Sequence, residues 1–171
     1  MNKRGAYFFV IDAMIASTII IMSLIIIFSS HTTRTESNPT VRMLGEYLSF
    51  ISTTKVRNFQ GSYVQNLTND GNITNRDNTL LGQLTEFYYY NQTGFKNTSI
   101  IMANFLQEIN KGAIPDYRSL AFYINDTLIY QSQFITPDEA GLGLNMKKIS
   151  FKRINDTYIY GPVIVEVRVW V

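Results

Sequence analysis

Few side chains in this sequence could perform catalysis or hold a metal ion. The 171 residues contain no cysteine and one histidine, His31. Thiolate metal sites, cysteine nucleophiles and most histidine-based catalytic pairs are therefore excluded. The carboxylates Asp116, Asp138 and Glu139 have no partner at a fixed spacing, and neither a phosphate-binding loop nor a Gly-X-Ser-X-Gly elbow occurs. We expect a protein that is not an enzyme and that needs no cofactor and no metal.

The carboxylate with the clearest chemical meaning is Asp12, because it is the single charged group in the 23 residues from Ala6 to Phe28. A carboxylate inside a membrane helix costs a few kcal/mol on insertion scales, and such groups are usually functional. Two interpretations stay open. Asp12 either lies near enough to the membrane edge to be partly hydrated, or meets a positive partner from another chain.

The apolar stretch around Asp12 predicts a transmembrane helix over residues 6–30, because about 20 apolar residues suffice to cross a bilayer. A buried core helix is the alternative. Lys3 and Arg4 precede the stretch, and the next basic residue, apart from His31, is Arg34. The positive-inside rule then places the N-terminus in the cytoplasm of a membrane-anchored protein and residues 31–171 outside.

Lys3-Arg4-Gly5, followed by an apolar helix with an early acid, resembles the prepilin-type (class III) signal peptide of type IV pilins and archaeal pilin-like proteins. In that family a membrane peptidase cuts after a basic leader that ends in glycine, and the helix then forms the filament core. The resemblance implies a leader over residues 1–5, a new N-terminus at Ala6, and pairing of Asp12 with a neighbour's N-terminal amine. The family's acid is usually a glutamate at the fifth mature position, whereas Asp12 would be the seventh.

The rest of the chain, residues 31–171, is predicted to form an extracytoplasmic α+β domain. Apolar residues at helical spacing predict amphipathic helices over 40–58, 78–90 and 97–110. The Asn-, Gly- and Thr-rich segment 60–78 predicts a loop. Whether the helix over 40–58 continues the first helix as one spine or packs separately stays open.

The C-terminal third predicts an antiparallel β-sheet. Apolar and other residues alternate over 120–124, 128–130, 149–151 and 163–171. Asn125-Asp126 and Asn155-Asp156 lie between strand-like runs, and both residue types tolerate the left-handed backbone of hairpin turns. We expect two hairpins in one sheet, with the terminal strand central or well paired. The three tyrosines at 88–90 predict a partly buried packing cluster rather than an adhesive surface.

Asn-X-Ser/Thr acceptor sites for N-glycosylation (sequons) occur six times in the predicted exterior, at Asn66, Asn72, Asn91, Asn97, Asn125 and Asn155. Composition alone would produce roughly two or three. Four lie in predicted loops or helix edges, and two lie at the predicted hairpin turns. We expect at least some of them to carry glycans.

The charge balance, 15 Lys+Arg against 13 Asp+Glu, points to no particular partner. The one basic cluster, Lys147-Lys148 and Lys152-Arg153, is expected to face water from a strand, and no nucleic acid is expected.

Together these features predict a pilin-like structural subunit of a cell-surface, pilus-like filament. It would be stored in the membrane, served by a prepilin-type peptidase and pilus assembly machinery, and assembled through its first helix into a homo-oligomer for adhesion or surface contact. The alternative is a signal-anchored surface protein, or a minor subunit of an envelope complex, that never polymerises. A membrane-anchored enzyme is a distant third possibility.

Overall fold

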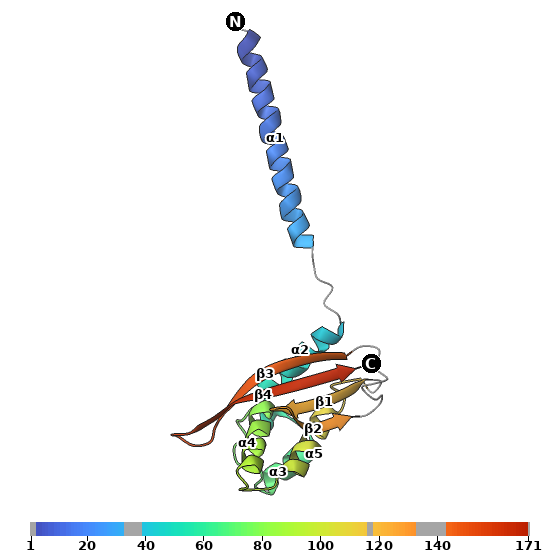
Figure 1. Ribbon diagram of the computed structural model, residues 1–171, viewed down its shortest axis with the longest axis vertical. Helices are drawn as coiled ribbons and strands as arrows, with labels where there is room; N and C mark the ends of the chain where they lie inside the picture. Colours follow the sequence, from blue (N-terminus) through green and yellow to red (C-terminus); the bar gives the residue numbers. More distant parts are fainter. Residues whose placement is uncertain (1–2, 33–38, 116–117, 133–142, 171) are drawn as a thin grey trace. The chain divides into compact units, whose positions relative to one another are not determined.

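The computed structural model describes residues 3–32, 39–115, 118–132 and 143–170 (Figure 1). Asp116, Asp138 and Glu139 lie outside these ranges. Contacts between residues divide the chain into two compact units, Met1–Ser37 and Asn38–Val171. Residues 33–38 also lie outside the described ranges. The structure therefore does not decide between the two predictions for the helix over 40–58, which either continues the first helix or packs separately.

In the first unit the structure describes one helix, α1, which runs from Lys3 to Thr32. The hydroxyl groups of Ser17, Thr18 and Ser23 are satisfied by the backbone of α1 itself. The Oγ of Ser17 and Oγ1 of Thr18 donate to the carbonyl of Met14 at 2.9 and 2.8 Å, and the Oγ of Ser23 donates to the carbonyl of Ile19 at 2.8 Å. These side chains therefore do not need polar partners from outside the helix. Within the described residues, no helix meets the combined length and apolarity that a membrane span requires.

The second unit is an α+β domain, as the sequence predicted. Its elements in chain order are α2 (Pro39–Thr53), the short 3-10 helix η1 (Val56–Asn58), α3 (Ser62–Asn69), α4 (Leu80–Gln92), α5 (Ser99–Asn110), β1 (Ser119–Ile124), β2 (Thr127–Ser132), β3 (Gly143–Arg153) and β4 (Ile159–Trp170).

The helix predictions are confirmed with two exceptions. The expected loop over 60–78 contains the two-turn helix α3, because Val64 and Leu67, three residues apart, both enter the core at 1% and 4% exposure. Burying these two side chains outweighs the weak helix propensity of the Asn- and Thr-rich segment around them. The predicted helix over 40–58 is also divided, since α2 ends at Thr53 and η1 follows.

The four strands form one antiparallel sheet in the order β2-β1-β4-β3 (Figure 1). Both predicted hairpins are present, and β4 is central, paired with β1 on one side and β3 on the other. Asn125 and Asp126 form the β1–β2 turn with φ of 46° and 62°. Both values lie in the left-handed region that Asn and Asp tolerate better than other non-glycine residues.

The core lies between one face of the sheet and the helices. Val163, Val165, Val167 and Val169 of β4 are at most 1% exposed. Helices α2, α4 and α5 pack against the strands. Between α4 and α5, the rings of Phe87 and Phe105 meet edge to face with centroids 5.7 Å apart.

Candidate functional site

The residues predicted for leader processing, Lys3, Arg4, Gly5 and Ala6, form the start of α1. Their side chains lie outside those that the structure describes. Asp12 is on α1 with an exposed side chain, and among the described residues no salt bridge includes it. Its carboxylate is therefore available for a partner from another molecule.

Helix α1 exposes large apolar side chains around its whole circumference. Ile19, Ile20, Ile21 and Met22 are consecutive and 56–62% exposed, although successive helical residues point about 100° apart. Other large apolar side chains along the helix are 36–68% exposed, namely Val10, Ile11, Met14, Ile15, Leu24, Ile25 and Ile26. A helix that is apolar on all sides is stable only when lipid or protein covers it.

The outer face of the sheet is partly apolar as well. On it, Ile149 of β3 lies directly opposite Ile164 of β4, and these side chains are 60% and 46% exposed. Phe151 is also 60% exposed, while Ser150 between the two β3 residues is buried. The alternation at 149–151 thus predicted a strand correctly, but the buried side of that strand is the one that carries Ser150.

A charged cluster occupies the middle of the same outer face. The carboxylate of Glu166 is within 2.7 Å of Nε of Arg168 and 3.1 Å of Nζ of Lys147, and Nδ2 of Asn145 donates to it at 3.3 Å. The guanidinium of Arg168 lies 4.2 Å from the ring centroid of Tyr123. The hydrogen bond from Arg168 is the main cause that lowers the pKa of Glu166 to about 2, with burial opposing it and Lys147 adding to it.

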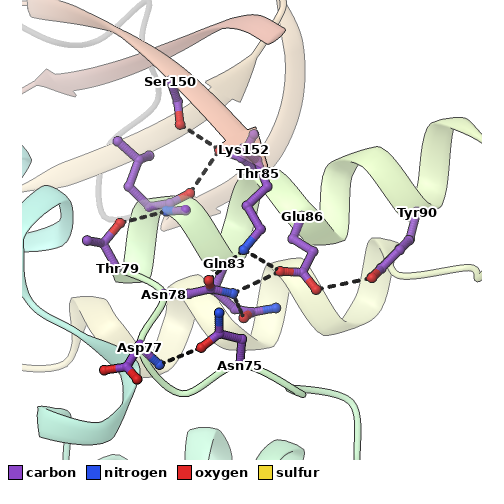
Figure 2. A network of polar contacts seen from close by, with 12 residues as sticks. Asn75, Asp77, Asn78, Thr79, Gln83, Thr85, Glu86, Tyr90, Ser150 and Lys152 are labelled. Atoms are coloured by element: carbon purple, nitrogen blue, oxygen red, sulfur yellow. Dashed lines mark hydrogen bonds and ion pairs between the residues drawn. The ribbon is translucent and has the colours of Figure 1, made fainter. Parts of the chain in front are cut away.

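A second polar network joins α4 to β3 (Figure 2). The Nζ of Lys152 lies 2.8 Å from Oε2 of Glu86 and donates to Oδ1 of Asn78 at 2.5 Å. The Nδ2 of Asn78 donates to Glu86 and to Oε1 of Gln83, both at 2.8 Å. The hydroxyl of Tyr90 donates to Oε1 of Glu86 at 3.1 Å, and burial, followed by Glu86, raises the pKa of Tyr90.

This network is best explained as a structural one. Its charges pair with each other, and close by the hydroxyls of Thr85 and Ser150 meet at 2.8 Å (Figure 2). Within the described structure Nε2 of Gln83 is buried without a hydrogen-bond partner, but the other contacts of the network are paired, and paired buried polar groups define one arrangement of the elements that carry them. Two of the four residues in the predicted basic cluster form ion pairs within the fold: Lys152 with Glu86 in this network, and Lys147 with Glu166 on the outer face of the sheet.

The prediction of a packing cluster at the three tyrosines is confirmed and extended. Tyr88 is 5% exposed, and the ring of Tyr89 lies 4.9 Å from that of Tyr160 and 6.1 Å from that of Tyr158. The sequence did not indicate that β3–β4 residues would join this cluster, because they are about 70 positions away along the chain.

The six sequons occupy different environments. Asn66, Asn97, Asn125 and Asn155 are exposed, and Asn72 and Asn91 are half-buried. Asn66 lies within α3 rather than in the predicted loop, while Asn125 and Asn155 lie at the two predicted hairpin turns.

No group of three or more His, Asp or Glu side chains that could hold a metal ion occurs among the residues that the structure describes. Comparison with known proteins identifies no relative, because no family model, curated protein or solved structure matches the chain.

Proposed function

We propose that the protein is a pilin-like structural subunit of an extracellular, type IV pilus-like filament. The observation that carries the proposal is that one chain contains two unlike parts. One is α1, which exposes apolar side chains on all sides and contains a single acid, Asp12, and the other is a compact α+β unit. A helix of that kind is suited to two environments, a lipid bilayer before assembly and a bundle of identical helices afterwards.

The proposed exchange between these environments is physically consistent. Between its ends, the backbone groups of a helix are bonded within the helix, and the hydroxyls of Ser17, Thr18 and Ser23 are too, so the middle of α1 needs no water in either place. Moving from lipid to a helix bundle keeps the apolar side chains covered throughout. Asp12 would then meet the new amine of Ala6 from a neighbouring copy, which neutralises the carboxylate in an apolar setting.

The proposed topology places the α+β unit outside the cell, in keeping with Lys3 and Arg4 before the apolar stretch and with the sequons after it. A prepilin-type peptidase would remove residues 1–5, and assembly machinery would extract the processed chain. The α+β unit would then line the filament surface and supply adhesion or surface contact. No catalytic step is assigned to it.

The first test is the mature N-terminus, measured by intact mass spectrometry of protein isolated from the cell surface. The proposal expects a chain that begins at Ala6. A Gly5→Val variant should keep Met1, whereas the control Gly45→Ala, whose added methyl group would meet nothing within 4 Å, should be processed normally. A surface-exposed wild-type chain that still begins at Met1 would refute the processing.

The second test separates the filament from the alternative of a signal-anchored protein that never polymerises. Sheared surface material is examined by negative-stain electron microscopy, and its peptides are identified. Filaments made mainly of this chain are the expected result. Retention of the processed chain in the membrane as a monomer would instead establish the anchored surface protein.

A further inference from the structure

The six sequons share one motif, but the fold holds them very differently. In Asn66-Leu67-Thr68 and Asn72-Ile73-Thr74 the middle residue is in the core, with Leu67 4% and Ile73 2% exposed. In Asn97-Thr98-Ser99 the middle residue, Thr98, is fully buried and donates to the carbonyl of Phe87. A glycosyltransferase that must enclose the acceptor segment could reach these three only by unfolding part of the domain.

Two further sequons are tied down by hydrogen bonds to other segments. The Oδ1 of Asn91 accepts from the backbone N–H of Thr98 at 3.2 Å and from Oγ of Ser99 at 3.1 Å. Asn125 is bonded twice to β4, since its N–H donates to the carbonyl of Ile164 and its Oδ1 accepts from the N–H of Ile164, both at 2.9 Å. Presenting either asparagine to an enzyme would break these contacts.

Asn155-Asp156-Thr157 is exposed at all three residues, as is Asn125-Asp126-Thr127, but its described hydrogen bonds stay within the turn instead of reaching another strand. The Oδ1 of Asn155 accepts from the Thr157 N–H and Oγ1, both at 3.0 Å, and from the Tyr158 N–H at 2.8 Å. The backbone N–H of Asn155 also stays local, donating to the carbonyl of Tyr158. The segment lies at the tip of the β3–β4 hairpin, which projects beyond the rest of the sheet (Figure 1).

This geometry also leaves the side-chain nitrogen accessible. Three donors converge on Oδ1 of Asn155 and hold the side-chain amide in one orientation at the turn. In the structure described here, Nδ2 of Asn155 has no hydrogen-bond partner, so it is open to an approaching reagent.

We propose that Asn155 is the principal glycan acceptor of the folded protein. The donor would be an oligosaccharide joined through phosphate to a lipid carrier. The Nδ2 of Asn155 forms a bond to the anomeric carbon, the bond from that carbon to the phosphate oxygen breaks, the carrier phosphate leaves with the electron pair, and a base of the transferase takes one Nδ2 proton. The inference rests on the proposed function for one point, the placement of residues 31–171 outside the cell.

The test is glycopeptide mapping of the full chain isolated from the cells that make it. Trypsin yields residues 154–168 with Asn155 alone, and residues 58–76 with both Asn66 and Asn72. The expected result is that most of the 154–168 peptide carries a glycan and most of the 58–76 peptide does not. Thr157→Val should remove one glycan mass from the intact protein and Thr157→Ser should retain it, while the control Thr68→Val should change nothing.

Three results would overturn the inference: an unmodified 154–168 peptide, equal modification of the 58–76 peptide, or a glycan retained in Thr157→Val. The N-terminal mass and the filaments are measured on the same samples. A chain that begins at Ala6 and forms filaments without a glycan at Asn155 therefore contradicts this inference alone. A chain that carries the glycan but keeps Met1 contradicts only the processing.

Discussion

The Nζ of Lys152 on β3 lies 2.8 Å from Oε2 of Glu86 on α4, and the two side chains are only 11% and 7% exposed. Each charge is costly in this position without the other. Because α4 and β3 are separated in the chain by two strands and a helix, the pair fixes how the helix layer lies on the sheet. Asn78 and Tyr90 also donate to this carboxylate, at Oε2 and Oε1 respectively.

Replacing one member of this pair should destabilise the domain strongly. In Lys152→Met the carboxylate of Glu86 loses its cation in a nearly buried site, and we expect a loss of about 3 kcal/mol in the free energy of unfolding. Urea denaturation in detergent, followed by the fluorescence of the single tryptophan, Trp170, measures it. The control is Arg42→Met, which breaks the exposed pair with Glu46 and should leave the free energy of unfolding nearly unchanged. Equal losses of unfolding free energy in the two variants would show that the Lys152–Glu86 pair stabilises the domain no more than an exposed ion pair does.

Glu166 should make stability depend on pH in the acid range. Its pKa is lowered from 4.5 to about 2 in the folded protein, so the folded state binds its proton less readily than the unfolded state. The stabilisation is therefore fully present above pH 4.5 and is lost as the pH falls through about 2. We expect a loss of at most about 3 kcal/mol over this window.

Comparing Glu166→Gln with the wild type isolates this contribution. Denaturation curves at several pH values between 6 and 2 should show a smaller decline for the variant, because it lacks the titrating carboxylate. Parallel declines in the two proteins would mean that other carboxylates dominate the acid response.

The edge-to-face contact between Phe87 and Phe105 should be central to core stability. Both rings are at most 1% exposed, so Phe87→Ala removes buried area and leaves a cavity between α4 and α5. We expect a cost of about 3–5 kcal/mol in the free energy of unfolding. Phe95→Ala, at a ring that is 79% exposed, is the matched control and should stay within about 0.5 kcal/mol. A small effect at Phe87 would indicate that the core can collapse around the missing ring.

Asp12 should be needed for assembly and not for anchoring. In Asp12→Ala the proposed partner amine loses its counter-charge, so we expect processed protein in the membrane and a loss of filaments in electron micrographs. Ser17→Ala, which removes a hydroxyl that is satisfied within α1, should assemble normally. Normal filaments from Asp12→Ala would favour the other interpretation, in which the acid is merely tolerated near the membrane edge.

Patterns with a short period predicted most of the elements. The spacing of Leu80, Leu81, Leu84 and Phe87 predicted α4, and the alternating valines of β4 predicted the central strand, because periods of about 3.6 and two residues place side chains on one face. Helix α3 was missed, since its two core residues are too few to stand out in an Asn- and Thr-rich segment. The hidden face of β3 was also not predictable, because Ser150 is buried through contact with Thr85, 65 positions away.

The sequence by itself determined that residues 6–28 form an all-round apolar helix with one acid, that the rest is an α+β domain, and that cysteine and most histidine chemistry are absent. These properties follow from composition and from neighbours a few residues apart. Only the tertiary structure decided that Lys147 and Lys152 are neutralised, that Tyr89 packs on the β3–β4 hairpin, and that Asn155 is the sequon held by its own turn alone. The reason is physical. The burial of a side chain, its ion pairs and its access to an enzyme depend on which distant segments pack together, and the Asn-X-Ser/Thr motif contains no information about that packing.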